Sequence, residues 1–364
     1  MTFCIQGAGY AVPTNLITQD DAARLAIELA GPTCANPTAI QSLYIKTGVR
    51  KRHSTVITCS TNGRPATQSF FPVALDDNYR GPTTRTRMDR YEAAALQLAT
   101  RAAESALAES RTAPLDITQL VTVSCTGFAA PGVDIGLVER LSLNRSVSRT
   151  HIGFMGCHGA LNGLRVAAAL SQATTGTVLL CCVELCSLHH QYAADAQQTV
   201  ANALFSDGAA AIVGACAQQP SGSTRWRIAS HFSCLLPNSV DLMSWRIGDN
   251  GFEMQLSSQV PSIIRQALRP WLSAQLAAHH LSIADIRGWA IHPGGPKILS
   301  ACAEALGLEP HCIHASQRVL EEYGNMSSPT VLFVIDELCQ RGDWLPCVAL
   351  AFGPGLSIEA ALLV

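Results

Sequence analysis

The first half of the sequence recurs in the second half as a pattern of helices and strands, and this repeat restricts the fold more than any other feature. In each half a long helical stretch leads into a short apolar strand, which opens at Asp116 and, 169 residues later, at Asp285. The glycines before Cys157 and Asn325 are 168 residues apart. The paired segments are YEAAALQLATRAAESALAES with IIRQALRPWLSAQLAAHH, PGVDIGLVERLSL with GGPKILSACAEALGL, GFMGCHGALNGLRVAAAL with EEYGNMSSPTVLFVIDEL, and TGTVLLCCVEL with DWLPCVALAFGPGL. Chance could imitate one pairing, but four in the same order predict a duplicated architecture.

The repeat also predicts the fold class and the division of the chain. Helices that alternate with continuous apolar strands are typical of an α/β protein, and we expect a mainly parallel sheet in each half, covered by helices. We assign residues 1–218 to an N-terminal half and 219–364 to a C-terminal half, joined near the Gln-, Pro-, Ser- and Gly-rich stretch 214–226. Residues 51–87 are polar, rich in Pro and Gly and without clear period, so we expect an insertion or lid there.

Charge and composition exclude several classes of partner. The formal net charge is −2, which gives no electrostatic case for binding nucleic acid or an anionic membrane. The opening residues MTFCIQGAGYAVPTN do not read as a signal peptide, and no apolar run approaches the roughly 18 residues of a membrane-spanning helix. The 14 cysteines, many within apolar strands, fit buried free thiols in a reducing compartment. We therefore expect a soluble cytoplasmic protein.

One of these cysteines, Cys157, has the surroundings of a nucleophile. It lies at the predicted start of a helix, where partial positive charge and free N–H groups favour a thiolate. Gly156 and Gly159 leave room for a substrate to approach the thiol. The alternative is a small buried hydrophobic residue, which is the usual role of a free cysteine.

The repeat supplies two partners for this thiol. If the halves are related by an approximate two-fold axis, Cys157 and Asn325 start equivalent helices and face one another. His292 ends a strand just before Pro-Gly-Gly, which is where open α/β folds place reactive groups. Cys, His and Asn together could act as nucleophile, base and hydrogen-bond donor. The structural alternatives are a helix N-cap for Asn325 and a satisfied buried histidine for His292.

Two Cys- and His-containing clusters superficially resemble metal sites, but we expect no metal. The first lies on and after a continuous apolar strand, where adjacent residues face opposite sides, and the second lacks another ligand pair. The clusters are Cys181, Cys182, Cys186, His189 and His190, and His311, Cys312 and His314.

Several stretches together resemble the type III polyketide synthases, the chalcone-synthase-like enzymes. They are RMDRYEAAALQLA, SCTGFAAPG, GFMGCHGALNGLRVA, IHPGGPKIL, EYGNMSSPTVLF and LAFGPGLSIEA, in this order across nearly the whole chain. The resemblance implies a thiolase fold of two pseudo-symmetric halves in a layered αβαβα arrangement, and a homodimer. It also implies acyl-CoA and malonyl-CoA as substrates, with no metal, nicotinamide or flavin cofactor.

The resemblance assigns a role to each of the three candidate residues. Cys157 takes the acyl group from coenzyme A, His292 pairs with the thiolate and then helps bind the next thioester carbonyl, and Asn325 donates its amide hydrogens to that carbonyl. Decarboxylation of malonyl-CoA then gives an enolate that lengthens the Cys157-bound chain by two carbons before ring closure.

The resemblance also points to residues around the cavity. Phe205 matches the gatekeeper phenylalanine, which otherwise reads as aromatic core, whereas Met254 replaces a second phenylalanine of the plant enzymes. Ser327 is retained. Four cavity positions differ from the plant pattern and are closer to bacterial members that make alkylpyrones, alkylresorcinols or polyhydroxynaphthalenes; they are Cys125, Cys186, His189 and Trp245. We therefore favour a fatty acyl starter extended to a pyrone or resorcinol, or another polyhydroxylated aromatic product.

Two lysines are candidates for binding the coenzyme phosphates. Lys46 matches a basic contact of the plant enzymes, and Lys297 could supply a replacement charge, although a surface lysine is the simpler interpretation. Two alternatives to the polyketide synthase remain at this point. One is a condensing enzyme like β-ketoacyl carrier-protein synthase III, and the other is an inactive thiolase-fold binding module.

Overall fold

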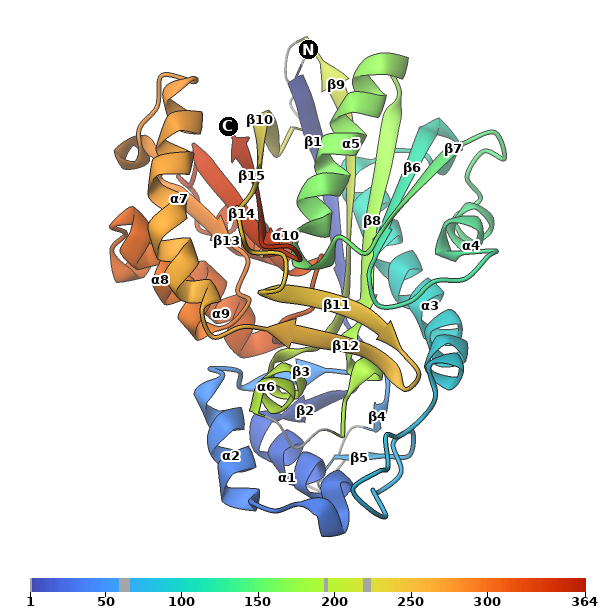
Figure 1. The fold of residues 1–364 in the computed structure, drawn as a ribbon. Coiled ribbons are helices and arrows are strands. Elements are labelled where there is room, and N and C mark those ends of the chain that lie inside the picture. Colours follow the sequence, from blue (N-terminus) through green and yellow to red (C-terminus); the bar gives the residue numbers. More distant parts are fainter. Residues whose placement is uncertain (1, 59–65, 193–195, 219–223) are drawn as a thin grey trace.

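One nine-stranded sheet organises the molecule, and its strand order shows the duplication directly. The computed structural model describes residues 2–58, 66–192, 196–218 and 224–364. The strands run in the order β13-β14-β15-β10-β1-β9-β8-β6-β7 (Figure 1). Their bounds are β1 Thr2–Ala11, β6 Ile117–Ser124, β7 Ser148–Gly153, β8 Thr177–Leu185, β9 Asp207–Ala217, β10 Trp226–Leu235, β13 Gly288–Ile291, β14 Cys347–Gly353 and β15 Ser357–Leu363. Outward from the central pair β1 and β10, the order β9-β8-β6 on one side matches β15-β14-β13 on the other.

The expectation of mainly parallel sheets is wrong. Only the pairs β6/β7, β6/β8 and β13/β14 are parallel, whereas β1/β9, β1/β10, β8/β9, β10/β15 and β14/β15 are antiparallel. The strands are continuously apolar because helices cover both faces, and burial on both faces says nothing about strand direction. The short connection between β14 and β15, which are separated only by Pro354–Leu356, permits a hairpin instead of a helical crossover.

The helices form three layers around the two halves of the sheet, which gives the αβαβα arrangement that the resemblance implied. On β8, Val178, Leu180 and Cys182 pack in the central core, and the intervening Leu179 and Cys181 pack in an outer one. The central layer consists of α5 (Gly159–Thr174) and α10 (Thr330–Cys339). The outer layers consist of α3 (Thr84–Ser110) with α4 (Val133–Arg140), and of α7 (Val260–Ala277) with α8 (Pro296–Leu306).

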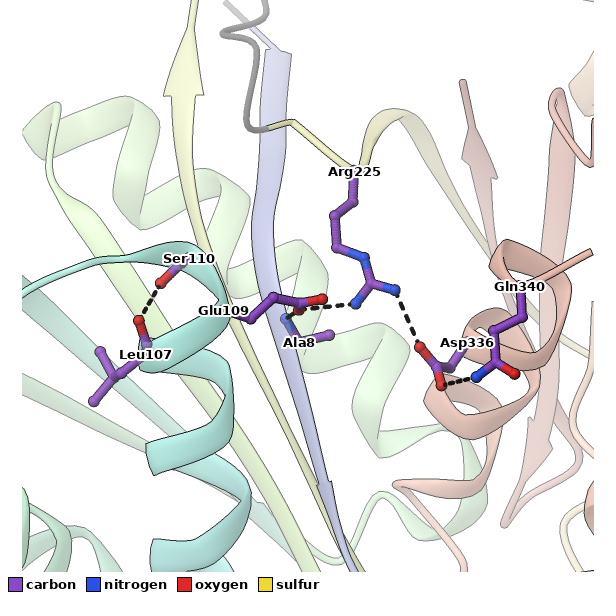
Figure 2. Close-up of polar contacts among 7 residues, drawn as sticks. All are labelled: Ala8, Leu107, Glu109, Ser110, Arg225, Asp336 and Gln340. Atoms are coloured by element: carbon purple, nitrogen blue, oxygen red, sulfur yellow. Dashed lines mark hydrogen bonds and ion pairs between the residues drawn. The ribbon is translucent and has the colours of Figure 1, made fainter. Parts of the chain in front are cut away.

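An ion-pair bridge ties the two halves together where β1 and β10 separate. These strands pair only over Phe3–Ile5, and beyond that point Ala8 N donates to Glu109 Oε2 at 2.5 Å. Arg225 donates to the same carboxylate oxygen at 2.9 Å and to Asp336 Oδ1, on α10, at 3.1 Å (Figure 2). A single guanidinium therefore links the outer helix of the first half to the central helix of the second.

The remaining elements cover the end of the sheet where the carboxyl ends of β6 and β8 lie (Figure 1). They are β2 Leu16–Thr18, α1 Gln19–Ala30, α2 Pro37–Lys46, β3 Lys51–His53, β4 Ile57–Thr58, β5 Thr67–Gln68, α6 Ala196–Leu204, the hairpin β11 Met243–Gly248 and β12 Gly251–Leu256, and α9 His314–Tyr323. The sequence stretch 51–87 contains β3, β4, β5 and the start of α3, with 59–65 outside the described residues. No helix in the described ranges is long and apolar enough to cross a membrane.

Candidate active site

Cys157 lies in a tight turn between a strand and a buried helix. After β7, Phe154 and Gly156 both have left-handed backbone angles, with φ of 56° and 68°. A Cβ at Gly156 would lie 2.8 Å from Pro354 Cδ, so only glycine lets the chain pass the loop that follows β14. One 3₁₀ turn, Gly156–His158, carries the thiol and leads directly into α5. The nucleophile candidate thus sits at the N-terminal end of a central helix.

Asn325 lies opposite this thiol but does not start a helix, which corrects the expectation drawn from the repeat. The helix α10 begins only at Thr330, with Pro329 as its N-cap residue, so Asn325 is no cap. Instead it forms an isolated parallel bridge with Phe205, in which Asn325 N donates to Leu204 O at 2.8 Å and Ser206 N donates to Asn325 O at 2.9 Å.

The side-chain amide of Asn325 has a fixed orientation. Its Oδ1 accepts a hydrogen bond from Ser327 N at 2.8 Å, in a turn that puts Ser327 in the left-handed region with φ of 58°. Cys157 Sγ lies 3.9 Å from Nδ2 and 4.0 Å from Oδ1, and because Oδ1 is already bound by Ser327 N, Nδ2 remains the free donor. The chain therefore presents an amide donor beside the thiol.

His292 completes the cluster at the end of β13. Its backbone N donates to Leu350 O on the neighbouring strand at 2.7 Å, and the residue is only 2% exposed. Neither ring nitrogen has a hydrogen-bond partner in the described part of the chain. Buried imidazole nitrogens are nearly always paired, so two free ones facing a cavity mark a position for a reacting group. His292, Cys157 and Asn325 all line that cavity.

Burial favours the uncharged form of both groups. The loss of solvent around Sγ raises the pKa of Cys157 to about 11, although hydrogen bonds from Ser327 and Asn325 oppose the rise. Burial, reinforced by the neighbouring His158, lowers the pKa of His292 to about 3. For each group taken alone, burial therefore favours the neutral form, and the ion pair that the resemblance implies stays a prediction.

Two small cavities meet at the thiol. On the side of His292 lies a cavity of about 40 Å³, which Phe205 and Met254 also line. On the other side lies one of about 20 Å³, between the thiol and the β11–β12 hairpin. The residues singled out from the sequence that line this second cavity are Cys125, Cys186, Phe205, Trp245, Met254 and Ser327.

His189 does not reach either cavity at the thiol. Its Nε2 lies 2.6 Å from Thr126 O and its Nδ1 accepts from Phe252 N at 3.0 Å, while its ring stacks on Phe252 at 4.1 Å. It meets Trp245 edge-on at 5.4 Å between ring centroids. His189 therefore supports the wall of these two cavities from behind, where it lines a third cavity.

A larger cavity of about 100 Å³ lies on the far side of that wall. Its floor is mostly apolar and includes Ile17, Leu25 and Leu29, from β2 and α1. Four residues line both this cavity and the one at the thiol; they are Cys186, Phe205, Trp245 and Met254. Trp245 is held in this partition by a hydrogen bond from its Nε1 to Cys125 O at 2.6 Å.

Neither lysine suggested for coenzyme binding lines these cavities. Lys297 is exposed on the first turn of α8, next to Ile298, which lines the cavity on the His292 side. Lys46 is exposed at the C-terminal end of α2. The structure thus brings one of the two near the thiol's cavity.

Within the described ranges, no three His, Cys, Asp or Glu residues are arranged to hold a metal ion.

Sequence reasoning missed Glu184, a buried carboxylate next to the site. Its Oε2 accepts from Cys125 N at 2.9 Å and from Thr126 Oγ1 at 2.8 Å, and its Oε1 accepts from Ser328 Oγ at 2.5 Å. Burial raises the pKa of Glu184 despite these donors. A lone acidic residue in the apolar strand TVLLCCVEL was the available signal, because such a residue needs several partners.

It also missed His158, directly after the nucleophile candidate. Its Nδ1 lies 2.6 Å from Asn162 Oδ1 and its Nε2 lies 2.6 Å from Ser357 Oγ. The ring packs on Gly353, where a Cβ would approach it to 2.2 Å. His158 therefore anchors the turn that carries Cys157 to the loop after β14.

Comparisons with known proteins place the whole chain among relatives of one kind. Models of the N-terminal and C-terminal domains of chalcone and stilbene synthases match residues 4–217 and 227–364. The α-pyrone synthesis polyketide synthase-like Pks18 of Mycobacterium tuberculosis is 33% identical over 98% of this chain and 90% of its own length. The 1,3,6,8-tetrahydroxynaphthalene synthase of Streptomyces peucetius is 33% identical over 97% and 90%. The crystal structure of PKS-I from the brown alga Ectocarpus siliculosus superposes with a TM-score of 0.90 at 31% identity, covering 100% of this chain and 98% of that one.

Proposed function

The chain belongs to the chalcone and stilbene synthase family and is a type III polyketide synthase, and from this premise we propose a role for each residue at the site. Cys157 carries the growing acyl chain. His292 accepts the thiol proton when this chain is loaded, and His292 and Asn325 together stabilise the enolate that extends it. The observation that carries the proposal is the cavity that these three residues share, where an amide donor lies beside the thiol and both ring nitrogens of the buried imidazole lack a partner among the described residues.

Loading needs a proton acceptor for the thiol. A free ring nitrogen of His292 takes the Sγ proton, and the pairing of thiolate with imidazolium offsets the burial that disfavours each charge alone. The thiolate attacks the carbonyl carbon of an acyl-CoA, and the sulfur of coenzyme A leaves with the proton from His292. The products are a Cys157 thioester and free coenzyme A.

Extension depends on hydrogen-bond donors aimed at the thioester oxygen of malonyl-CoA. As CO₂ leaves, negative charge moves to this oxygen, where the Nδ2 group of Asn325 and an N–H of His292 stabilise the enolate. One such donor is worth about 3 kcal/mol in comparable oxyanion sites. The enolate carbon then attacks the Cys157 thioester, which forms a carbon–carbon bond and releases the thiolate. These steps draw on coenzyme A thioesters and side chains alone.

For the starter we propose a fatty acyl group, and for the product a pyrone or resorcinol. A relative named for α-pyrone synthesis and the apolar cavity behind Trp245 support this choice. The relative named as a tetrahydroxynaphthalene synthase supports the second candidate, a polyhydroxylated aromatic built from malonyl units. The comparisons give no support to a β-ketoacyl carrier-protein synthase.

We further propose that the enzyme is a homodimer that meets its copy beside the nucleophile. Phe128, Phe154 and Met155 are 50%, 38% and 42% exposed, and Met155 is two residues from Cys157. Phe154 and Met155 directly follow β7, the edge strand of the sheet, and the ring centre of Phe128 lies 6.2 Å from that of Phe154. An apolar patch next to an unpaired edge strand suits a second copy of this chain.

Two further parts of the proposal concern coenzyme binding and location. Lys297, near the mouth of the cavity, offers a point charge to a coenzyme phosphate, and Lys46 offers a more remote one. All cysteines within the described ranges are free thiols, which fits a reducing cytoplasm.

The test is product analysis by mass spectrometry after incubation with malonyl-CoA and a graded series of acyl-CoA starters. Products whose mass follows the starter support the fatty acyl proposal, whereas one product from malonyl-CoA alone supports the polyhydroxylated aromatic. Cys157→Ala should abolish extension and keep some decarboxylation, and Asn325→Ala should lose decarboxylation itself. Cys302→Ala, which removes a buried thiol from α8, is the matched control and should stay active. Full-length product from Cys157→Ala would remove the central claim.

A further inference from the structure

Arg52, a buried residue of β3, contacts the segment that carries the gatekeeper candidate. Its guanidinium Nη1 donates to two backbone carbonyls, Asn202 O at 2.5 Å and Phe205 O at 3.0 Å. The residue is 8% exposed, and the nearby carboxyl group of Asp207 partly compensates its charge. The guanidinium also lies 5.7 Å from the centre of the Tyr44 ring. A buried guanidinium that donates to two backbone carbonyls and is itself held by Tyr44 fixes the position of those carbonyl oxygens.

The two carbonyls lie at the C-terminal end of α6, where a helix has free acceptors and partial negative charge. In a continuing helix, Asn202 O would accept from the N–H of residue 206. Here Arg52 takes that acceptor, and Ser206 N donates to Asn325 O instead, at 2.9 Å. The guanidinium thus ends the helix where the bridge to Asn325 begins.

Arg52 also touches the other side of this bridge. Gly324, the residue before Asn325, has φ of 70°, and a Cβ there would lie 3.1 Å from Arg52 Cγ and 2.9 Å from Leu204 O. The aliphatic part of the arginine therefore packs against Gly324, on the Asn325 side of the bridge, while its guanidinium binds carbonyls on the Phe205 side. The next residue of β3 adds to this hold, because Ser206 Oγ donates to His53 O at 2.9 Å.

The bridge joins two residues, Phe205 and Asn325, whose side chains both lie at the site of the thiol. The ring of Phe205 lines both cavities at the thiol, and the side chain of Asn325 presents Nδ2 to Cys157 Sγ. We infer that Arg52 is a positioning residue for decarboxylation and starter selection, which it couples by fixing the Phe205–Asn325 bridge. The inference rests on the proposed function, since it assumes that Asn325 binds the malonyl thioester oxygen.

The test compares Arg52→Met with Arg52→Lys and with a matched control. Arg269→Met is that control, because Arg269 makes the same kind of contact at the end of α8, where its Nε donates to Ala305 O at 2.9 Å and its Nη2 donates to Leu306 O at 2.5 Å. Each variant is assayed for malonyl-CoA decarboxylation, for the rate of Cys157 alkylation by iodoacetamide, for starter preference and for melting temperature.

We expect Arg52→Met to lower kcat for decarboxylation by about 10–100-fold, because small displacements of a catalytic group have effects of this size. KM for malonyl-CoA and the alkylation rate of Cys157 should stay near those of the parent, and discrimination between acyl starters should weaken. Arg52→Lys should recover part of the loss, since an ammonium lacks the planar fork but can still donate to a helix-end carbonyl. Arg269→Met should keep the parent kcat.

A purely structural role would give a different pattern. The inference is overturned if Arg52→Met lowers the melting temperature but leaves kcat and starter preference unchanged. If Arg52→Met does not fold, the same comparison is made with Arg52→Lys. An equal loss in Arg269→Met would also overturn it, since helix capping alone would then explain the effect. If the parent enzyme itself does not decarboxylate malonyl-CoA, the proposed function is refuted. That result differs from one in which the parent is active and the Arg52 variants keep its kcat, which refutes only the inference about Arg52.

Discussion

Replacing Trp245 by alanine should lengthen the starter that the enzyme prefers. The indole stands on β11 opposite Met254 of β12, and it separates the 20 Å³ cavity at Cys157 from the 100 Å³ cavity beneath α1. Alanine at this position joins the two cavities and gives a longer acyl chain an apolar place to lie. Burial of a methylene group is worth about 0.8 kcal/mol, so two additional methylenes supply about 1.6 kcal/mol.

This free energy converts to a measurable change in specificity. Since about 1.4 kcal/mol corresponds to a factor of ten, kcat/KM for a starter longer by two methylenes should rise about 15-fold relative to the shorter one. The assay is competition between pairs of acyl-CoA thioesters in one reaction, with products quantified by mass spectrometry. Ile247→Ala, on the same strand with a side chain 53% exposed, is the control and should leave the ratio unchanged.

Two results would refute this reasoning. The first is an unchanged ratio in Trp245→Ala when the melting temperature shows that the variant is folded. The second is equal gain for all starters, which would mean that the indole limits access to Cys157 and does not divide the space beyond it. Trp245→Phe, which loses the hydrogen bond to Cys125 O but retains a ring, should change the ratio less than alanine does.

Three further outcomes follow from the structure. If His292 takes the proton of Cys157, alkylation of Cys157 should be nearly independent of pH around neutrality in the parent, whereas in His292→Ala it should rise about tenfold per pH unit, because burial then keeps the thiol protonated; equal slopes in both would exclude the ion pair. Lys297→Ala should raise KM for malonyl-CoA and leave kcat unchanged, and an unchanged KM would exclude the lysine from coenzyme binding. Arg225→Met should lower the free energy of unfolding by about 1 kcal/mol in urea denaturation, since the half-buried Asp336 and the exposed Glu109 lose their partner, with decarboxylation per folded molecule retained (Figure 2).

The duplication could be predicted from the sequence because the buried apolar residues follow the same order of strands and helices in both halves. The strands that open at Asp116 and Asp285 correspond to β6 and β13, which occupy equivalent places on the two sides of the sheet. Strand direction could not be read in the same way. The residues of β8 and β14 are apolar on both faces whichever way β9 and β15 run, and direction is set by the lengths of the connections.

The walls of the cavity were less predictable than its nucleophile. Trp245 becomes a partition because the β11–β12 register sets it opposite Met254 and because its Nε1 reaches Cys125 O, more than one hundred positions earlier in the chain. His189 lines the larger cavity behind that partition and not the two cavities at the thiol, since Phe252 and Thr126 satisfy both of its ring nitrogens. Such placements depend on contacts between distant segments, and a residue type at a motif position does not encode them.

The departure from symmetry at Asn325 explains how equivalent segments supply different chemistry. Cys157 is followed almost at once by α5, so it keeps the helix N-terminus that favours a thiolate. Asn325 is held away from α10 by its bridge to Phe205, and four residues separate it from the first residue of that helix. Had Asn325 capped α10, the N–H groups of the first turn would have set the orientation of its amide. Because Ser327 N holds Oδ1 instead, the Nδ2 group is left for the cavity, where the opposite half presents its thiol.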